Sequence, residues 1–95
     1  MTNYSNGRRA EWAARDELIK QGYTVTRSAG SKGCIDLVAW NYDGTRLVQV
    51  KKGSGRATPK EREALAAFDI PPHSTVEIWH RESGQWEVEK VRSRE

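Results

Sequence analysis

The chain has 95 residues, of which 36% are hydrophobic and 31% charged, and its 16 Lys and Arg against 13 Asp and Glu give a formal charge of +3. This length fits a single domain, residues 1–95, in which we expect residues 1–6 to form a disordered tail, and the single cysteine excludes an internal disulfide. No apolar run approaches the roughly 18 residues of a membrane span and no signal peptide precedes the domain, so we expect a cytoplasmic protein, encoded by a cell or by a phage.

Helical and extended patterns alternate along the chain. The expected elements, in order, are a helix over 7–21, strands over 23–27, 35–40 and 46–51, a helix over 58–69, and strands over 76–80 and 86–91. Gly22 is a natural stop for the first helix. Thr58-Pro-Lys-Glu61 has the pattern of a capping box that opens the second. The order α-β-β-β-α-β-β predicts an α/β domain with a mixed central β-sheet flanked by helices.

Glu11 interrupts the apolar side of the first predicted helix. At about 100° per residue, it falls in the middle of the arc formed by Ala10, Trp12, Ala14, Leu18 and Ile19. Burying an unpaired carboxylate is costly. The ordinary structural explanation is an ion pair with Arg15, one turn later on the same helix. The alternative explanation is a functional carboxylate.

Polar residues also interrupt two predicted strands. Asp36 lies in the apolar segment 35–40, where Asp is uncommon, although an Asp at the start of a strand can simply cap a turn. Gln49 and Lys51 project from one face at the end of the next strand, because alternate residues of a strand share a face. Taken singly, such a polar pair is typical of a solvated strand face.

Together, Glu11, Asp36, Gln49 and Lys51 form the set of groups that phosphodiester hydrolysis needs. Oxygen atoms of the first three would hold Mg²⁺, with Mn²⁺ as a possible substitute. The metal would polarise the phosphate and lower the pKa of a bound water. Lys51 would orient the nucleophile or balance charge on the phosphorane. We therefore predict a metal-dependent nuclease with these four catalytic residues.

Two segments carry a resemblance to a known family. They are Arg27-Ser-Ala-Gly-Ser-Lys-Gly-Cys-Ile-Asp36-Leu-Val-Ala39 and Leu47-Val-Gln-Val-Lys-Lys52. With Glu11 and the Gly22-Tyr-Thr-Val25 segment, they resemble the archaeal-type Holliday junction resolvases over residues 7 to about 68. Those proteins are homodimeric nucleases with a PD-(D/E)XK core. The resemblance implies a restriction-endonuclease-like fold and cutting of branched DNA, four-way junctions first, in DNA recombination and repair.

The resemblance also implies roles for single residues. The family's helix Glu matches Glu11, its metal-binding Asp matches Asp36, and its strand Lys matches Lys51. Its Arg-Ser-x-Gly-Ser loop, which approaches DNA, matches the segment 27–32. The other cations are concentrated in the first two thirds of the chain, which permits nucleic-acid binding. The predicted DNA contacts are Arg8, Arg9, Arg15, Arg27, Ser28, Ser31, Lys32, Lys52 and Arg56.

The chain departs from the family pattern at two positions. Gln49 stands where the family usually has Glu; its carbonyl oxygen can still bind a metal, but weaker affinity is expected because one negative ligand is lost. Trp12 stands where an Arg commonly follows the helix Glu, which leaves a charge role that Arg15 could fill.

Two other functions stay open. One is a nuclease of the same type with another DNA target, such as nicking, flap cutting or restriction. The other is a DNA-binding module with a decayed catalytic site, which only Gln49 favours. His73 and His80 lie far from the predicted site in the sequence and lack metal-ligand spacing, so we expect surface or strand positions for them. Cys34 is expected to pack as a small hydrophobic residue.

Paired cuts across a four-way junction predict a homodimer, because one compact domain carries one active site. We expect the interface to use part of the C-terminal sheet or the second helix. The late strands carry the apolar residues Val76, Ile78, Trp79, Trp86, Val88 and Val91. The alternative is that these residues form the core of the single chain, since domains this small can fold alone.

Overall fold

The computed structural model describes residues 3–28 and 34–95. The elements are α1 (Asn3–Lys20), β1 (Thr24–Arg27), β2 (Leu37–Asn41), β3 (Gly44–Lys52), α2 (Pro59–Ala66), β4 (Ser74–Glu82) and β5 (Gln85–Arg94). The predicted order α-β-β-β-α-β-β is therefore confirmed. In the described part of the chain, neither helix combines the length and the apolar character that crossing a bilayer requires.

The strands form one five-stranded sheet in the order β1-β2-β3-β4-β5. Neighbouring strands are antiparallel except β3 and β4, which are parallel. A parallel pair needs a crossover, and α2 supplies it between β3 and β4. The predicted mixed sheet is confirmed. Because β3 and β4 run in the same direction, residues at their carboxyl ends meet at one edge of the sheet.

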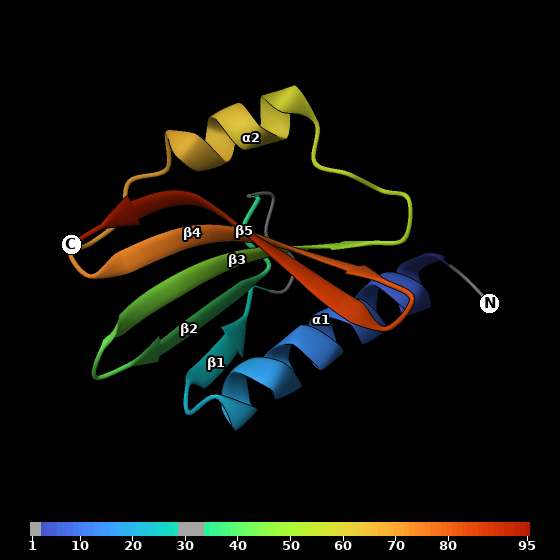
Figure 1. Cartoon of the computed structure of the whole chain (residues 1–95), viewed down its shortest axis with the longest axis horizontal. Helices are drawn as coiled ribbons and strands as arrows, with labels where there is room; N and C mark the ends of the chain where they lie inside the picture. Colours follow the sequence, from blue (N-terminus) through green and yellow to red (C-terminus); the bar gives the residue numbers. More distant parts are fainter. Residues whose placement is uncertain (1–2, 29–33) are drawn as a thin grey trace.

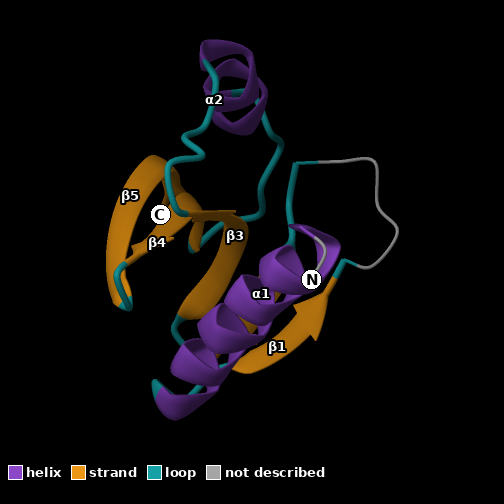
Figure 2. Cartoon of the chain, turned by 90° about the vertical axis from the view of Figure 1, so that its right-hand side faces the viewer, coloured by secondary structure: helices purple, strands orange, loops and turns teal. Residues whose placement is uncertain are grey.

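The two helices cover opposite faces of the sheet, with α2 on one side and α1 on the other (Figure 1). In the view turned by 90°, α1 runs across the sheet, and α2 lies at the top, well separated from α1 (Figure 2). Each helix packs on its own buried cluster. Ala14 and Leu18 of α1 pack with Val48, whereas Leu65 of α2 packs with Leu47 on the opposite face of β3. Gln49 and Lys51, which alternate with Val48 and Val50, therefore face the α2 side.

The first helix differs from its prediction at its start. It begins at Asn3, so residues 3–6, expected as part of a disordered tail, are helical. The early start has no local signal, because Ser5, Asn6 and Gly7 all have low helix propensity. The predicted stop is confirmed: α1 ends at Lys20, and Gly22 adopts a positive φ of 96°, which glycine tolerates without steric cost.

The buried arc of α1 is narrower than predicted. Ala10, Ala14 and Leu18 are buried, but Trp12 is 43% exposed and Ile19 is 51% exposed. The sheet touches only the stripe at i, i+4 and i+8, so side chains at the borders of the predicted arc stay in solvent. Likewise α2 ends at Ala66 and not near Asp69.

The second helix begins as predicted. Thr58 is its N-cap, Pro59 is in its first turn, and Glu61 completes the capping box. The Thr58 hydroxyl accepts a hydrogen bond from the Glu61 backbone N–H at 3.1 Å, and Glu61 Oε1 accepts one from the Thr58 backbone N–H at 2.9 Å. This reciprocal pair fixes where Glu61 projects from the first turn of α2.

Several apolar residues expected at a dimer interface lie inside the single chain. Val76, Ile78 and Trp79 of β4 are almost fully buried, so the expectation that they are available to a partner is wrong. The reason is that β4 is an interior strand with a helix packed over each face. Trp86 of β5 also packs edge-on against Trp79, with ring centroids 5.3 Å apart, whereas Val88 remains 47% exposed.

Candidate active site

Asp36 lies directly before β2 and is held by three hydrogen bonds. Its backbone N–H donates to the Val48 carbonyl at 2.8 Å, and its carbonyl accepts from the Ser28 N–H at 2.9 Å. Its side-chain Oδ2 accepts a hydrogen bond from the Val50 N–H at 2.8 Å. The backbone and the carboxylate of Asp36 are therefore fixed to β3 at Val48 and Val50, the two residues that flank Gln49.

The electrostatic surroundings of Asp36 show that several charged groups are gathered near it. Its pKa is raised, first by burial and then by the negative charges of Glu11 and Glu61. The Val50 hydrogen bond and the positive charge of Lys51 act in the opposite direction. A carboxyl group whose pKa is shifted by burial and by neighbouring charges is often found at a functional site.

Gln49 and Lys51 lie on β3 and face α2, as the alternation predicts. Lys51 Nζ donates to Glu61 Oε2 at 2.9 Å, and Gln49 Nε2 lies 3.4 Å from the same oxygen. Gln49 is only 5% exposed. Its Oε1 is buried and has no hydrogen-bond partner among the described residues. A buried acceptor without a partner is costly, which makes it a candidate ligand atom.

Glu11 forms an ion pair, but not with the predicted partner. Arg27 Nε donates to Glu11 Oε1 at 3.1 Å, whereas Arg15 pairs with its neighbour Asp16 at 3.2 Å. The intrahelical pairing is therefore wrong, because the end of β1 brings Arg27 against this side of α1. The Glu11 carboxylate is thus paired with the Arg27 guanidinium. Its negative charge also raises the pKa of Asp36.

The donor chemistry fits a hard divalent cation. The Asp36 carboxylate and the Gln49 carbonyl oxygen are oxygen ligands of the kind that Mg²⁺ prefers. In the part of the chain that the structure describes, no three His, Cys, Asp or Glu side chains are grouped closely enough to hold a metal ion by themselves. Gln49 Oε1, the buried oxygen without a partner among the described residues, is the candidate ligand beside the carboxylates.

Sequence reasoning missed two neighbours of Lys51. Glu61 is predicted from the sequence only as a capping residue, yet its Oε2 contacts both Gln49 and Lys51. His80, expected at a surface or strand position, lies in β4 opposite Lys51 in the parallel register and is 5% exposed, with Nε2 bonded to the Gly53 carbonyl. Neither proximity has a local sequence signal, because both depend on how the crossover returns to the sheet.

Other minor expectations are mostly met. Cys34 packs against the cluster on the α2 side, as expected for a small hydrophobic residue. His73 is exposed, in the connection before β4.

The predicted DNA-binding cations occupy several places. Arg9 and Lys52 line a pocket of about 450 Å³ together with Arg81, which the sequence did not single out. Arg56 pairs with Glu87 at 3.1 Å and is largely exposed. Arg8 is half-buried on α1. Ser28 follows β1, and the predicted contacts Ser31 and Lys32 lie outside the described residues.

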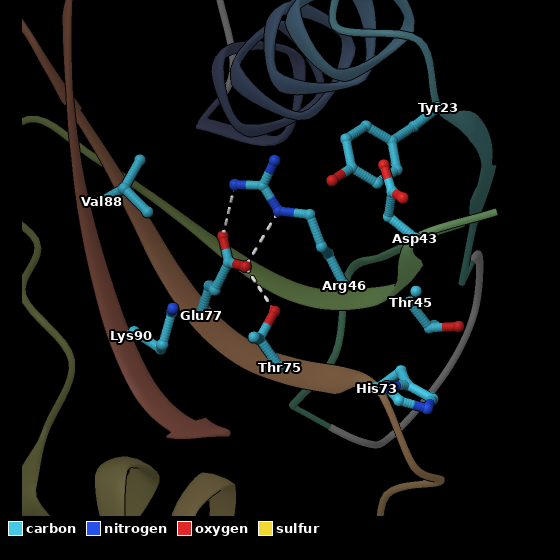
Figure 3. Close-up of a pocket in the computed structure, with 10 residues that line it drawn as sticks. Tyr23, Asp43, Thr45, Arg46, His73, Thr75, Glu77, Val88 and Lys90 are labelled. Atoms are coloured by element: carbon cyan, nitrogen blue, oxygen red, sulfur yellow. Dashed lines mark hydrogen bonds and ion pairs between the residues drawn. The ribbon is translucent and has the colours of Figure 1, made fainter. Parts of the chain in front are cut away.

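A second pocket, of about 400 Å³, lies where β3 and β4 begin, at the end of these strands away from Lys51 (Figure 3). The Arg46 guanidinium donates to both carboxylate oxygens of Glu77, at 2.7 and 2.9 Å, and stacks over Tyr23. Burial raises the pKa of Glu77, but hydrogen bonds from Arg46, Thr75 and Trp79 outweigh it and the pKa is lowered. This buried pair is engaged within the fold, so we assign it to structure.

The comparisons with known proteins give a similarity in structure but no match in sequence. By sequence, the chain matches no protein-family model and no curated protein. By structure, it is similar to a Holliday junction resolvase from the archaeal hyperthermophile Archaeoglobus fulgidus, with a TM-score of 0.75 and 26% identity. The match covers 90% of this chain and 73% of the resolvase. The resemblance noted in the sequence and the restriction-endonuclease-like fold are thereby confirmed.

Proposed function

We propose that this protein is a metal-dependent endonuclease that cuts branched DNA, with the four-way junction as its first substrate. One observation carries the proposal: the Asp36 carboxylate accepts the Val50 N–H of β3, and Gln49, the preceding residue of that strand, has a buried Oε1 with no hydrogen-bond partner among the described residues. The structural similarity to a Holliday junction resolvase supports the resolvase-like nuclease class. Roles in DNA recombination and repair belong to this proposal, as does a cytoplasmic location, which the single cysteine suits.

In this proposal Asp36, Gln49 and Glu11 hold Mg²⁺, and Mn²⁺ can substitute. When bound, the cation supplies positive charge to the scissile phosphate and lowers the pKa of a water. Lys51 orients that nucleophile or balances charge on the phosphorane. Lys51 Nζ is paired with Glu61 Oε2 at 2.9 Å, so the ammonium group is held on the face of β3 that bears Gln49 and Lys51.

We propose that the DNA backbone follows the cations around this edge of the sheet. The pocket lined by Arg9, Lys52 and Arg81 offers positive charge beside the end of β3, and phosphate contacts of this kind position a duplex without reading its sequence. The remaining proposed contacts are Arg8, Arg15, Arg27, Ser28, Ser31, Lys32 and Arg56.

A DNA-binding module with a decayed site is the second candidate, because Gln49 lacks the charge of a Glu. Nicking of supercoiled plasmid with Mg²⁺ and with EDTA separates the two. We expect relaxed circles only with Mg²⁺. A protein that shifts DNA in gels but leaves plasmid intact in both Mg²⁺ and Mn²⁺ is a binding module.

Gln49→Leu should lose cleavage activity that high Mn²⁺ restores only in part. The substitution removes the Oε1 ligand and puts an apolar side chain of similar size in its buried position. Gln49→Glu should tighten Mn²⁺ binding and retain activity, because it adds a negative ligand. Metal-dependence curves of plasmid nicking check both variants. Full activity of Gln49→Leu at low metal would remove Gln49 from the site.

We also propose that the active form is a homodimer, since two opposed cuts need two active sites. With Val76, Ile78 and Trp79 buried in the single chain, the interface has to use the exposed side of β5, which includes Val88, or α2. Edge strands such as β5 carry backbone groups that can pair with another chain. The interface should bury at least about 1,000 Å² in total.

Sedimentation equilibrium at micromolar concentration checks the oligomer. We expect about twice the 10.8 kDa mass of the chain. A mass near 10.8 kDa that persists after junction DNA is added would rule out the dimer and, with it, paired cutting.

A further inference from the structure

Glu61, in the first turn of α2, contacts the face of β3 that bears Gln49 and Lys51. Its two carboxylate oxygens have separate partners. Oε1 accepts the Thr58 backbone N–H at 2.9 Å, which anchors it to the helix start. Oε2 accepts from Lys51 Nζ at 2.9 Å and lies 3.4 Å from Gln49 Nε2. The carboxylate is thus held by the capping box on one side and directed at β3 on the other.

This contact decides which way the Gln49 amide points. The NH₂ group is turned toward the Glu61 carboxylate, since an anion attracts a donor and repels the amide oxygen. Oε1 is left buried on the other side, without a hydrogen-bond partner among the described residues. Gln49 is 5% exposed, so water has little access to satisfy that oxygen from outside.

Glu61 also supplies a negative charge close to Asp36. Its carboxylate acts on Asp36 in the same sense as Glu11 does, and Lys51 acts in the opposite sense. Replacing Gln49 with a carboxylate would add a further anion within about one hydrogen-bond length of Glu61. The neutral Gln49 on β3 therefore fits the carboxylate of Glu61 on α2, because it donates a hydrogen bond to that carboxylate and adds no negative charge.

We infer that Glu61 is a positioning residue of the cation site: it orients Gln49 so that Oε1 faces a divalent cation, and it provides the negative charge that Gln49 lacks. This inference rests on the proposed function, because it assumes that the face of β3 bearing Gln49 binds a divalent cation.

The test is Mn²⁺ binding, followed by electron paramagnetic resonance of the free ion, without DNA. Glu61→Gln keeps the capping box, because Gln serves at this helix position as well as Glu. The variant should bind Mn²⁺ about 10–100-fold more weakly than wild type, as expected when a group that orients a ligand is lost. Glu63→Gln, which removes a charge from an exposed position of the same helix, is the matched control and should bind as wild type.

A charge exchange gives the second measurement. The double variant Gln49→Glu/Glu61→Gln moves the carboxylate from α2 to β3, and its affinity should return to within about threefold of wild type, because the charge count is restored. The step from Gln49→Glu to the double variant repeats the Glu61 substitution in a second background, so the comparison survives if Glu61→Gln alone does not fold.

The outcomes are distinguishable. Wild-type affinity in Glu61→Gln, or equal weakening by Glu63→Gln, overturns the role of Glu61 and leaves the proposed nuclease intact. A double variant that binds no better than Glu61→Gln also overturns it. A wild-type protein that binds no Mn²⁺ overturns both the inference and the metal-dependent function.

Discussion

Asp36→Asn should abolish cleavage while DNA binding stays close to wild type. Asn removes the charged ligand but keeps the shape of the side chain. Its amide oxygen can still accept the hydrogen bond from the Val50 N–H, which in wild type is 2.8 Å long. Loss of the metal ligand removes both phosphate polarisation and water activation. Cleavage of a four-way junction, together with gel-shift affinity in EDTA, measures the two effects. Asp43→Asn, at an exposed turn, is the matched control and should cut normally.

The same variant should be at least as stable as wild type at neutral pH. The pKa of Asp36 is raised in the folded state, first by burial, so folding disfavours its ionised form. The resulting loss of stability is absent below the ordinary pKa of an Asp and develops as pH rises through the raised value. Urea unfolding of wild type and Asp36→Asn at neutral pH checks this. A markedly less stable Asp36→Asn would mean that the carboxylate serves the fold.

Lys51→Ala should lower the cleavage rate by about two orders of magnitude or more, the range seen when one electrostatic stabiliser is removed. Lys51 faces α2, where it contacts Glu61, whereas Lys52 lines the pocket with Arg9. Lys52→Ala should therefore weaken DNA binding modestly and reduce the salt slope by roughly one, with little change in the rate of the bound complex.

Single-turnover cleavage of junction DNA, with protein in excess, separates these effects. Junction affinity at several salt concentrations completes the comparison. Equal losses of cleavage rate in Lys51→Ala and Lys52→Ala would contradict the geometry of β3, in which successive residues lie on opposite faces.

The parts of the site that the sequence predicted are those with a local signal. Asp36 interrupts the apolar segment 35–40, although the strand itself begins only at Leu37. Gln49 and Lys51 share a face of β3 because alternate residues of a strand do so. The capping box at Thr58 and the stop at Gly22 are equally local, and both are where they were expected. The fold order followed from the same signals.

The pairings between elements could not be predicted in this way. Glu11 forms its ion pair with Arg27 because β1 returns along α1. Helical spacing, the only local cue, points to Arg15 as the partner. His80 lies opposite Lys51 only because β3 and β4 are parallel in one particular register. Glu61 reaches β3 through the docking of α2. Each of these contacts joins segments far apart in the sequence, whose register has no local cue.

The most direct measurement is cleavage of an end-labelled four-way junction beside a linear duplex that contains the same arm sequence, in Mg²⁺ and in EDTA. We expect wild-type protein to convert the junction into nicked duplexes through cuts on two opposed strands, only when Mg²⁺ is present, and to leave the linear duplex essentially intact. Wild-type protein that binds the junction yet leaves it uncut in both Mg²⁺ and Mn²⁺ would contradict the nuclease assignment. Equal cutting of junction and duplex would contradict structure selectivity.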